Sequence, residues 1–358
     1  MKAVQYEEFG GPLSVIDAPE PGLPPHGAII EVRAAGMCRS DWHGWQHHDP
    51  DIVPPQIPGH EWAGVVVRVG DNVTRWRGGE RVTAPFVCGC GSCEWCAKGD
   101  QQVCERQTQP GFTHGGAFAE RLMVDHADLN LVALPDSVDF VTAASLGCRF
   151  ATAFRAVAQQ GRPGIGDWVA VHGCGGVGLS AVMVAVSAGA RVVAVDISDD
   201  PLKLAAELGA ARCLNSSEFE GDAVRIGDAV RDMTVGGVAL SLDAFGSLVT
   251  SAASVCSLRR RGRHVQVGVL PPAQGVPPYP MHRVMGWELE IVGSHGMSAH
   301  TYPAMLAAVT AGSLRPDRLV TRRAGLEDVC ELLPQFSKPG GPGITVVEMP
   351  GESECRRP

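Results

Sequence analysis

Five cysteines fall in one short stretch, VCGCGSCEWCAKGDQQVC, at residues 87–104. Four of them have the spacing Cys-x2-Cys-x2-Cys-x7-Cys, and these are Cys90, Cys93, Cys96 and Cys104. Two-residue gaps let neighbouring thiolates converge on one cation, and four thiolates close a tetrahedral zinc site to substrate. The spacing therefore predicts a structural metal site, with an iron–sulfur cluster and a redox Cys-x-x-Cys pair as alternatives. Cys88 falls outside the pattern.

A second group of possible metal ligands is spread over the first 150 residues. Cys38 lies in AGMCRSDWHGW, His60 in IPGHEWAGVV and Cys148 in AASLGCRFATA. Two thiolates and one imidazole suit zinc and leave a fourth place for water or substrate, as a catalytic site requires. Taken singly, each residue is equally typical of a protein core, and sequence spacing alone does not join the three. The adjacent His47 and His48 are expected to be exposed loop residues.

The third candidate is a glycine-rich turn, AVHGCGGVGLS, between an apolar strand and an apolar helix. The next strand ends in Asp196, twenty-one residues after Gly175. Such a turn brings a helix N-terminus to a pyrophosphate, and the acid hydrogen-bonds the ribose hydroxyls. Because an acid repels a 2′-phosphate, the pattern predicts NAD rather than NADP. The alternative is a doubly wound turn that binds no nucleotide.

The elements that position these residues differ between the two parts of the chain. Residues 1–150 are rich in glycine, proline and short β-branched runs, which predicts a β-rich module. After residue 150 strands alternate with helices, which predicts right-handed βαβ units and a parallel sheet. The proline-rich stretch LPPAQGVPPYP, residues 270–280, is expected to mark the passage between domains. The sequence predicts an α/β protein with one domain of residues 1–150 and 290–358 and another of residues 151–289.

Composition restricts the classes of partner. The chain has 358 residues, 45% of them hydrophobic, which fits two packed domains. Its net charge of −9 argues against nucleic acid and anionic membrane as partners. It has no apolar run of about eighteen residues, the length that a membrane span needs. The start, MKAVQYEEFGGPL, has acids where a secretory signal has its apolar core, so we expect a cytoplasmic protein with reduced cysteines.

Taken together, these motifs resemble the zinc-dependent alcohol dehydrogenases of the medium-chain dehydrogenase/reductase family. The resemblance is carried by GMCRSDWHG, PGHEWAGVVVRVGDNVTRWRGGERV, CGCGSCEWCAKGDQQVC, SLGCRF, GCGGVGLSA and VVAVD, in the family's order and over essentially the whole chain. It implies a GroES-like β-rich catalytic domain with a structural zinc lobe at about residues 88–105. It also implies a Rossmann doubly wound NAD-binding domain, two zinc ions per chain and a homodimer or homotetramer.

The resemblance also implies roles for single residues. A catalytic zinc would be held by Cys38, His60 and Cys148, and Glu61 could approach it. Asp41 would orient His60, a role that fits metal sites in general. Ser40 and His43 would pass the proton from the alcohol towards solvent. The cofactor would be bound by Arg39, Gly173, Gly175, Gly176, Val177, Gly178, Asp196 and Gly268, and the substrate pocket would include Trp42 and Phe86.

The implied reaction interconverts an alcohol and an aldehyde or ketone by hydride transfer with NAD. Zinc would lower the pKa of the bound alcohol, so that an alkoxide forms near neutral pH. A polyol or formaldehyde-adduct dehydrogenase of the same family is one alternative, and a non-catalytic NAD- and zinc-binding relative is another. Two positions depart from the family pattern. Pro201 stands where relatives often carry a lysine near the ribose, and Ile344 where some carry a phosphate-binding arginine; both bear on cofactor affinity.

Overall fold

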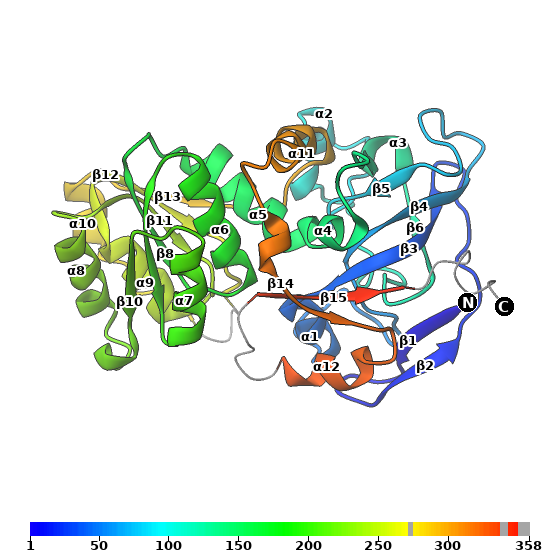
Figure 1. Cartoon of the computed structure of the whole chain (residues 1–358), viewed down its shortest axis with the longest axis horizontal. Coiled ribbons are helices and arrows are strands. Elements are labelled where there is room, and N and C mark those ends of the chain that lie inside the picture. Colours follow the sequence, from blue (N-terminus) through cyan, green and yellow to red (C-terminus); the bar gives the residue numbers. More distant parts are fainter. Residues whose placement is uncertain (271–274, 337–342, 350–358) are drawn as a thin grey trace.

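The computed structural model describes residues 1–270, 275–336 and 343–349. Two large sheets lie side by side along the long axis, each with its own helices (Figure 1). One sheet has six strands and the other seven, and a separate pair is formed by β1 (Lys2–Tyr6) and β2 (Leu13–Asp17). Part of the proline-rich stretch, residues 271–274, lies outside the described residues.

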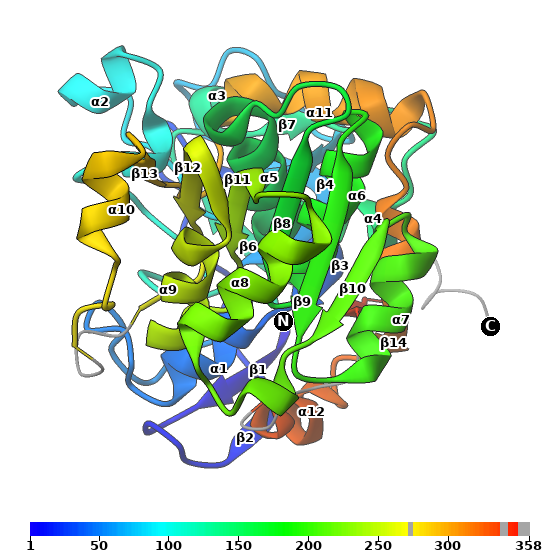
Figure 2. The same cartoon turned by 90° about the vertical axis from the view of Figure 1, so that its left-hand side faces the viewer.

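The six-stranded sheet is parallel throughout. Its strands are β8 (Trp168–His172), β9 (Arg191–Asp196), β10 (Arg212–Asn215), β11 (Val238–Asp243), β12 (Leu258–Gln266) and β13 (Glu290–Gly293). They are ordered β10-β9-β8-β11-β12-β13, from right to left in Figure 2. The order reverses between β8 and β11, and ligands of such sheets bind at this point, outside the carboxyl ends of the strands. The predicted α/β class and doubly wound parallel sheet are confirmed.

Both faces of this sheet are covered by helices. Val169 and Val171 of β8 belong to a core that includes residues of α6 (Gly176–Ser187) and α7 (Asp199–Glu207). Ala170, which points the other way, packs in a core with α8 (Ala223–Met233) and α9 (Leu248–Cys256). Burial on both faces explains why the central strands β8 and β9 read as nearly continuous apolar runs in the sequence.

The seven-stranded sheet joins the two ends of the chain. Its order is β14-β15-β3-β4-β5-β7, and β6 also pairs with β3. The strands are β3 (Ala28–Met37), β4 (Glu61–Val69), β5 (Arg81–Thr83), β6 (Arg121–Val124), β7 (Val132–Ala133), β14 (Val320–Ala324) and β15 (Ile344–Glu348). Only β14 and β15 are parallel to each other; the other pairs are antiparallel.

The position of β13 corrects the predicted boundary between residues 289 and 290. Residues 290–293 pair in parallel with residues 263–266 of β12, so they complete the six-stranded sheet. After β13 the chain returns to the seven-stranded sheet only at β14. The proline-rich stretch predicts a boundary that is too early, because the run LEIVGS after it adds one more strand to the parallel unit.

A helical segment leads from one sheet to the other. It consists of α4 (Phe140–Ala144), η2 (Leu146–Phe150), α5 (Ala151–Phe154) and η3 (Arg155–Gly161). Segments η2 and η3 have the wider turn of a π-helix, which occurs frequently at functional sites. Here α4 packs on β3 and β4, whereas α5 packs on α6.

The remaining helices are short. They are α1 (Arg39–Trp45), α2 (Glu94–Ala97), α3 (Ala127–Asn130), α10 (Met281–Gly286), α11 (Tyr302–Thr310) and α12 (Val329–Gln335), with single turns η1 (Gln101–Val103), η4 (Ser217–Phe219), η6 (Ala299–Thr301) and η7 (Pro316–Leu319). Within the described ranges, no helix has the length and apolar character that crossing a bilayer requires.

Candidate active site

Four residues that are distant in sequence meet between the two sheets. The ligand atoms of Cys38, His60, Glu61 and Cys148 all lie within 4.8 Å of one another, and we call these residues the mixed set. Cys38 directly precedes α1, His60 directly precedes β4, and Cys148 lies in η2. The structure therefore brings together the three residues that were predicted as ligands of a catalytic metal. Their role as ligands stays a prediction.

Two glycines let the elements of the mixed set approach one another. Gly36 of β3 pairs with Glu61 of β4, so the end of one strand lies beside the start of the next. A Cβ on Gly36 would overlap the carboxylate of Glu61, and one on Gly147 would lie 3.2 Å from the Cα of Glu61. The hydroxyl of Tyr302 in α11 donates to the carbonyl of Gly147 at 3.1 Å. Close backbone contact thus places η2 over the start of β4.

Asp41 fixes the orientation of His60 and the loop before it. One carboxylate oxygen lies 2.7 Å from Nδ1 of His60 and accepts from the N–H of Gly59 at 3.1 Å. The other accepts from the N–H of Cys38 at 2.9 Å. Because Nδ1 donates to Asp41, the lone pair of the neutral ring is on Nε2. That atom is buried and has no hydrogen-bond partner among the described residues.

An unpartnered buried nitrogen between two thiols is the donor set that zinc prefers. Buried polar atoms are nearly always paired, so Nε2 of His60 calls for a group that the protein chain does not supply. Cys148 donates to the sulfur of Cys38, and this bond, with nearby Arg149 and His60, holds the pKa of Cys38 well below its ordinary value. The same bond raises the pKa of Cys148. Two cysteine sulfurs and one imidazole nitrogen that lie this close together are ligands that zinc binds. The mixed set fits zinc.

Glu61 is paired with an arginine that sequence reasoning missed. Nε of Arg149 donates to both carboxylate oxygens of Glu61 at 3.1 Å, and a terminal nitrogen also contacts one of them. The backbone N–H of Arg149 donates to Glu61 at 2.9 Å. Burial raises the pKa of Glu61 against the opposing effect of Arg149, and the carboxylate raises the pKa of the guanidinium. The only signal in the sequence was that Arg149 follows a proposed ligand.

The predicted relay residues lie on α1. Ser40 and His43 are three residues apart, which places them on one face of the helix. The Ser40 hydroxyl lies 3.7 Å from the sulfur of Cys38. Nδ1 of His43 lies 2.8 Å from Nδ1 of His48. His48 is exposed, as the sequence predicted, but its contact with His43 was not foreseen.

Aromatic side chains surround His60 and the start of α1. Phe86 is buried, and its ring meets the His60 ring edge-on at 6.1 Å. Phe112 does the same at 5.4 Å, although no motif in the sequence points to it. Trp42 is half-buried and packs against His43, with 4.9 Å between ring centres. The predicted pocket aromatics thus border the site, as does Phe112.

The four regularly spaced cysteines of residues 87–104 form a second, separate set. The sulfurs of Cys90, Cys93, Cys96 and Cys104 lie within 4.8 Å of one another, and we call them the four-cysteine set. Backbone N–H groups of Cys90 and Cys96 donate to the sulfurs of Cys104 and Cys93, each at 3.4 Å. Such bonds favour thiolates. Cys88 is buried outside the set, and burial raises its pKa to about 12.

The glycines of the turn between β8 and α6 serve different purposes. Gly173 has a φ of +90°, which a residue with a Cβ rarely adopts. A Cβ on Gly178 would overlap the carbonyl oxygen of Gly173, and one on Gly176 would lie 2.6 Å from Cδ of Arg149. Gly175 has no other atom within 4 Å of its Cβ position. The turn is therefore open at Gly175, directly before the N-terminus of α6, where a phosphate fits. Val177, predicted with this turn, lies in the first turn of α6.

Asp196 ends β9 beside this turn. Its carboxylate accepts from the N–H groups of Cys174 at 2.7 Å and Ser198 at 3.0 Å. Gly268 follows β12 at the same edge and donates to the carbonyl of Asp243 at 2.8 Å. The predicted cofactor residues of the parallel sheet thus share its carboxyl edge, where a dinucleotide binds in this fold.

Arg39 lies across from this edge, on α1. Its guanidinium carbon is 5.8 Å from the ring centre of Phe245, which follows β11. At the two departures from the family pattern, Pro201 lies in the first turn of α7 and Ile344 is buried in β15. Lys203, two residues after Pro201, pairs with Asp200 at 3.0 Å.

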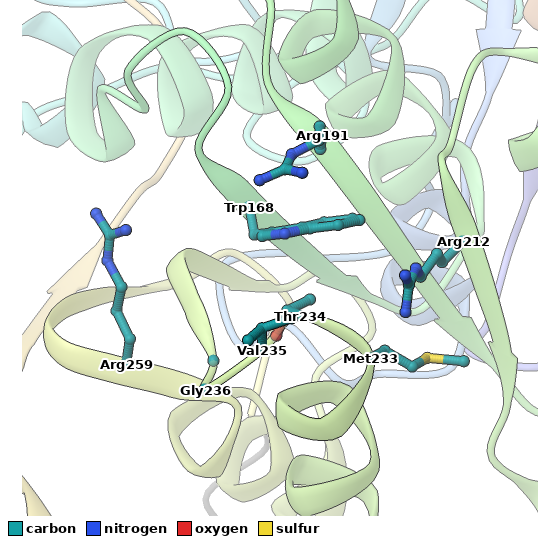
Figure 3. A pocket seen from close by; sticks show the side chains of 9 residues that line it. Trp168, Arg191, Arg212, Met233, Thr234, Val235, Gly236 and Arg259 are labelled. Carbon is teal, nitrogen blue, oxygen red and sulfur yellow. The ribbon is translucent and has the colours of Figure 1, made fainter.

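A surface cavity of about 410 Å³ lies at the opposite, amino edge of the parallel sheet. It is lined by Trp168, Arg191 and Arg212, the first residues of β8, β9 and β10. Arg191 stacks on the Trp168 ring, and Thr234 and Val235 face the ring from its other side (Figure 3). The described residues that line it include none of the predicted site residues, so the cavity is separate from the candidate active site.

Two family models match the chain. The Alcohol dehydrogenase GroES-like domain matches residues 24–136, and the Zinc-binding dehydrogenase model matches residues 176–311. The first covers most of the mixed set and the whole four-cysteine set, and the second begins at Gly176 of the glycine turn.

Similar proteins extend over nearly the whole chain. An alcohol dehydrogenase of Geobacillus stearothermophilus is 35% identical over 300 residues, which cover 82% of this chain and 84% of that one. A sorbitol dehydrogenase of Halalkalibacterium halodurans is 30% identical, over 90% of this chain and 92% of that one. The solved structure of the alcohol dehydrogenase TADH from Thermus sp. ATN1 superposes with a TM-score of 0.87 and 31% identity, over 97% of this chain and 99% of that one. The chain belongs to the zinc-dependent alcohol dehydrogenases of the medium-chain dehydrogenase/reductase family.

Proposed function

We propose that the enzyme interconverts alcohols with aldehydes or ketones, using one zinc in the mixed set and NAD at the carboxyl edge of the parallel sheet. The observation that carries this proposal is the buried, unpartnered Nε2 of His60 between the thiols of Cys38 and Cys148. Three soft ligands leave one place for substrate. The glycine turn lies close to this set, because Arg149 touches both.

Zinc, when bound, supplies Lewis-acid chemistry: it lowers the pKa of an alcohol or polarises a carbonyl. Cys38, His60 and Cys148 hold the metal, and Asp41 keeps the His60 ring in its orientation. Phe86 and Phe112 pack on that ring and exclude water from the site. Exclusion of water protects a hydride transfer from competing proton reactions.

The proton leaves along α1. Ser40, beside Cys38, takes the proton of the substrate hydroxyl, and His43 accepts it further along the same helix face. Burial, Arg39 and His48 lower the pKa of His43 to about 4, so its ring is neutral at physiological pH and hands a proton on rather than retaining it. The exposed His48, 2.8 Å away, passes the proton to solvent.

NAD is the proposed cofactor because of Asp196. Its carboxylate is held beside the glycine turn by two backbone N–H groups and repels the 2′-phosphate of NADP. The four-cysteine set holds a second, structural zinc, because all four of its thiols converge on one point and leave no open position.

A polyol dehydrogenase is the second candidate. The similarity to the sorbitol dehydrogenase of Halalkalibacterium halodurans favours it. The half-buried Trp42 and buried Phe86 favour an apolar substrate instead. NAD-linked absorbance with short, long, aromatic and polyol alcohols separates the two: faster turnover of sorbitol than of every simple alcohol would establish the polyol reaction.

We further propose that the enzyme works in the cytoplasm as a homodimer or homotetramer. The cysteines of the described residues form no disulfide with one another. Free thiols persist in a reducing compartment such as the cytoplasm. Exposed Met281 and Met285 lie on α10, next to the edge of the parallel sheet that ends in β13, and such surfaces favour self-association. Light scattering of the wild type and of Met285→Glu tests the assembly.

Cys148→Ala tests the active site. Removal of a metal ligand should lower turnover by more than about a hundredfold, since even outer-sphere partners contribute 10–100-fold. NADH binding, measured by fluorescence, should remain. Cys330→Ala, in α12 and outside both sets, is the matched control. Metal analysis should give two zinc ions per wild-type chain and one after Cys38→Ala with His60→Ala. Normal turnover of Cys148→Ala refutes the proposal.

A further inference from the structure

Arg149 touches both the mixed set and the glycine turn. It follows Cys148 directly in η2, so its backbone is fixed beside a proposed metal ligand. Its side chain is 7% exposed and that of Glu61 is 0% exposed, so water does not compete for their ion pair.

The guanidinium occupies both oxygens of Glu61. Nε lies 3.1 Å from each of them, and Nη2 contacts one as well. Yet Glu61 also belongs to the mixed set, because one of its oxygens lies within 4.8 Å of the other three ligand atoms. A carboxylate held in this way has its lone pairs directed to the guanidinium and is a poor metal ligand until the pair opens.

The aliphatic part of Arg149 lies on the first residue of α6. A Cβ on Gly176 would be 2.6 Å from Cδ and 3.5 Å from Nη1 of Arg149. Nη1 has no hydrogen-bond partner within residues 1–270, 275–336 and 343–349. This donor lies beside Gly176, the first residue of α6, where the helix N-terminus attracts phosphate. A phosphate oxygen there gains a charged donor.

Resting on the proposed function, we propose that Arg149 is a positioning residue that couples cofactor binding to metal coordination. It holds Glu61 off the metal when the cofactor is absent, and it turns towards the pyrophosphate when the dinucleotide binds. Glu61 is then free to move to the metal. Because such coupling is reciprocal, a Glu61 bound to metal also leaves Arg149 free for the cofactor. A buried arginine thereby takes the place of the cation that Ile344 does not supply.

The test uses the full-length enzyme with Co²⁺ in the mixed set, whose visible absorption reports the number of ligands. NADH should shift the cobalt bands of the wild type. Glu61→Gln, which keeps the shape of the side chain but binds metal poorly, should lose that shift. Arg155→Met, in η3, is the matched control, because Arg155 contacts Ser294 and not Glu61. It should behave as the wild type does.

The affinity for NADH tests the contribution of Arg149 separately from that of Glu61. Arg149→Met alone leaves Glu61 buried without a partner, so the double variant Arg149→Met/Glu61→Gln is compared with Glu61→Gln. Loss of a charge-assisted hydrogen bond should weaken NADH binding about tenfold or more in the double variant. Equal affinities of the two, or an undiminished cobalt shift in Glu61→Gln, would overturn the coupling. Absence of the sulfur-to-cobalt absorption from the wild type would refute the proposed function instead.

Discussion

Asp41 and His60 form a buried pair in which one carboxylate oxygen lies 2.7 Å from the imidazole Nδ1. Both side chains are completely buried. The same carboxylate accepts from the backbone N–H groups of Cys38 and Gly59. One side chain on α1 therefore organises two of the three proposed zinc ligands.

Asp41→Asn should loosen zinc in the mixed set. The amide is neutral and polarises the imidazole less than a carboxylate does, so zinc affinity should fall about 10–100-fold. Competition with a chromogenic chelator measures it. Asp139→Asn, at the N-cap of α4, serves as the control, because its carboxylate contacts only Thr142. Equal zinc affinities in wild type and Asp41→Asn would contradict the role assigned to Asp41.

Two alanine substitutions in the glycine turn should have opposite consequences. Gly175→Ala meets open space, so the melting temperature should hold while NADH binding weakens, because the methyl group fills the phosphate position. Gly178→Ala forces a Cβ into the carbonyl of Gly173 and should lower stability by roughly 1–3 kcal/mol. Thermal unfolding measures the stability of each variant, and NADH fluorescence measures its cofactor affinity. Strong NADH binding by Gly175→Ala would contradict the assignment of the phosphate site to the open space at Gly175.

Asp196→Asn should weaken the preference for NAD. The amide oxygen still accepts one backbone N–H, so the turn keeps its shape, but the repulsion of a 2′-phosphate is lost. The ratio of kcat/KM with NAD to that with NADP should fall at least about tenfold, the effect of roughly 1.4 kcal/mol. Asp200→Asn, an exposed neighbour that pairs with Lys203, should leave the ratio as it is. An unchanged ratio in Asp196→Asn would show that selectivity is set elsewhere.

Two buried histidines should make the parallel sheet sensitive to acid. Burial lowers the pKa of His172 to about 3 and that of His264 to about 4, from an ordinary value of 6.5. Below pH 6.5 the unfolded chain binds protons that the folded chain excludes, so the free energy of unfolding falls as pH falls towards 4. The slope is at most about 1.4 kcal/mol per pH unit for each histidine.

His172→Gln checks this prediction. Glutamine cannot take up a proton in this range and can still contact Ser257, the hydrogen-bond partner of His172. Denaturant unfolding at pH 7.5, 6 and 5 should show a smaller loss of stability in the variant than in the wild type. If both lose the same amount, His172 is not the source.

Residues whose signal is local in sequence were predictable. The glycine turn, the helix after it and Asp196 lie within one βαβ unit, and the structure places Asp196 beside the turn, as their spacing predicts. The four cysteines are equally local. Cys38, His60 and Cys148 could be grouped as ligands of one metal only through the family resemblance. Strand pairing and the packing of η2 bring them together, and sequence spacing predicts neither.

Other features depend on packing that no local pattern encodes. Arg149 matters because of where its guanidinium ends, between Glu61 and Gly176. Phe112 reaches His60 from an irregular loop that has no periodicity. The boundary near residue 290 was misplaced for a related reason: proline-rich composition marks a loop but does not say which sheet the next strand joins.

The pairing of β15 with β3 has a consequence for folding during synthesis on the ribosome. The parallel sheet is contiguous in the chain, so it can assemble as soon as residue 293 has emerged. β3 has to wait for β15, which follows the whole parallel sheet in the chain, before the edge that it shares with that strand is covered. Domains that emerge intact fold as units during synthesis. The parallel sheet should therefore be complete first, and Cys38, which follows β3 directly, should acquire its metal only after β15 has emerged and paired with β3.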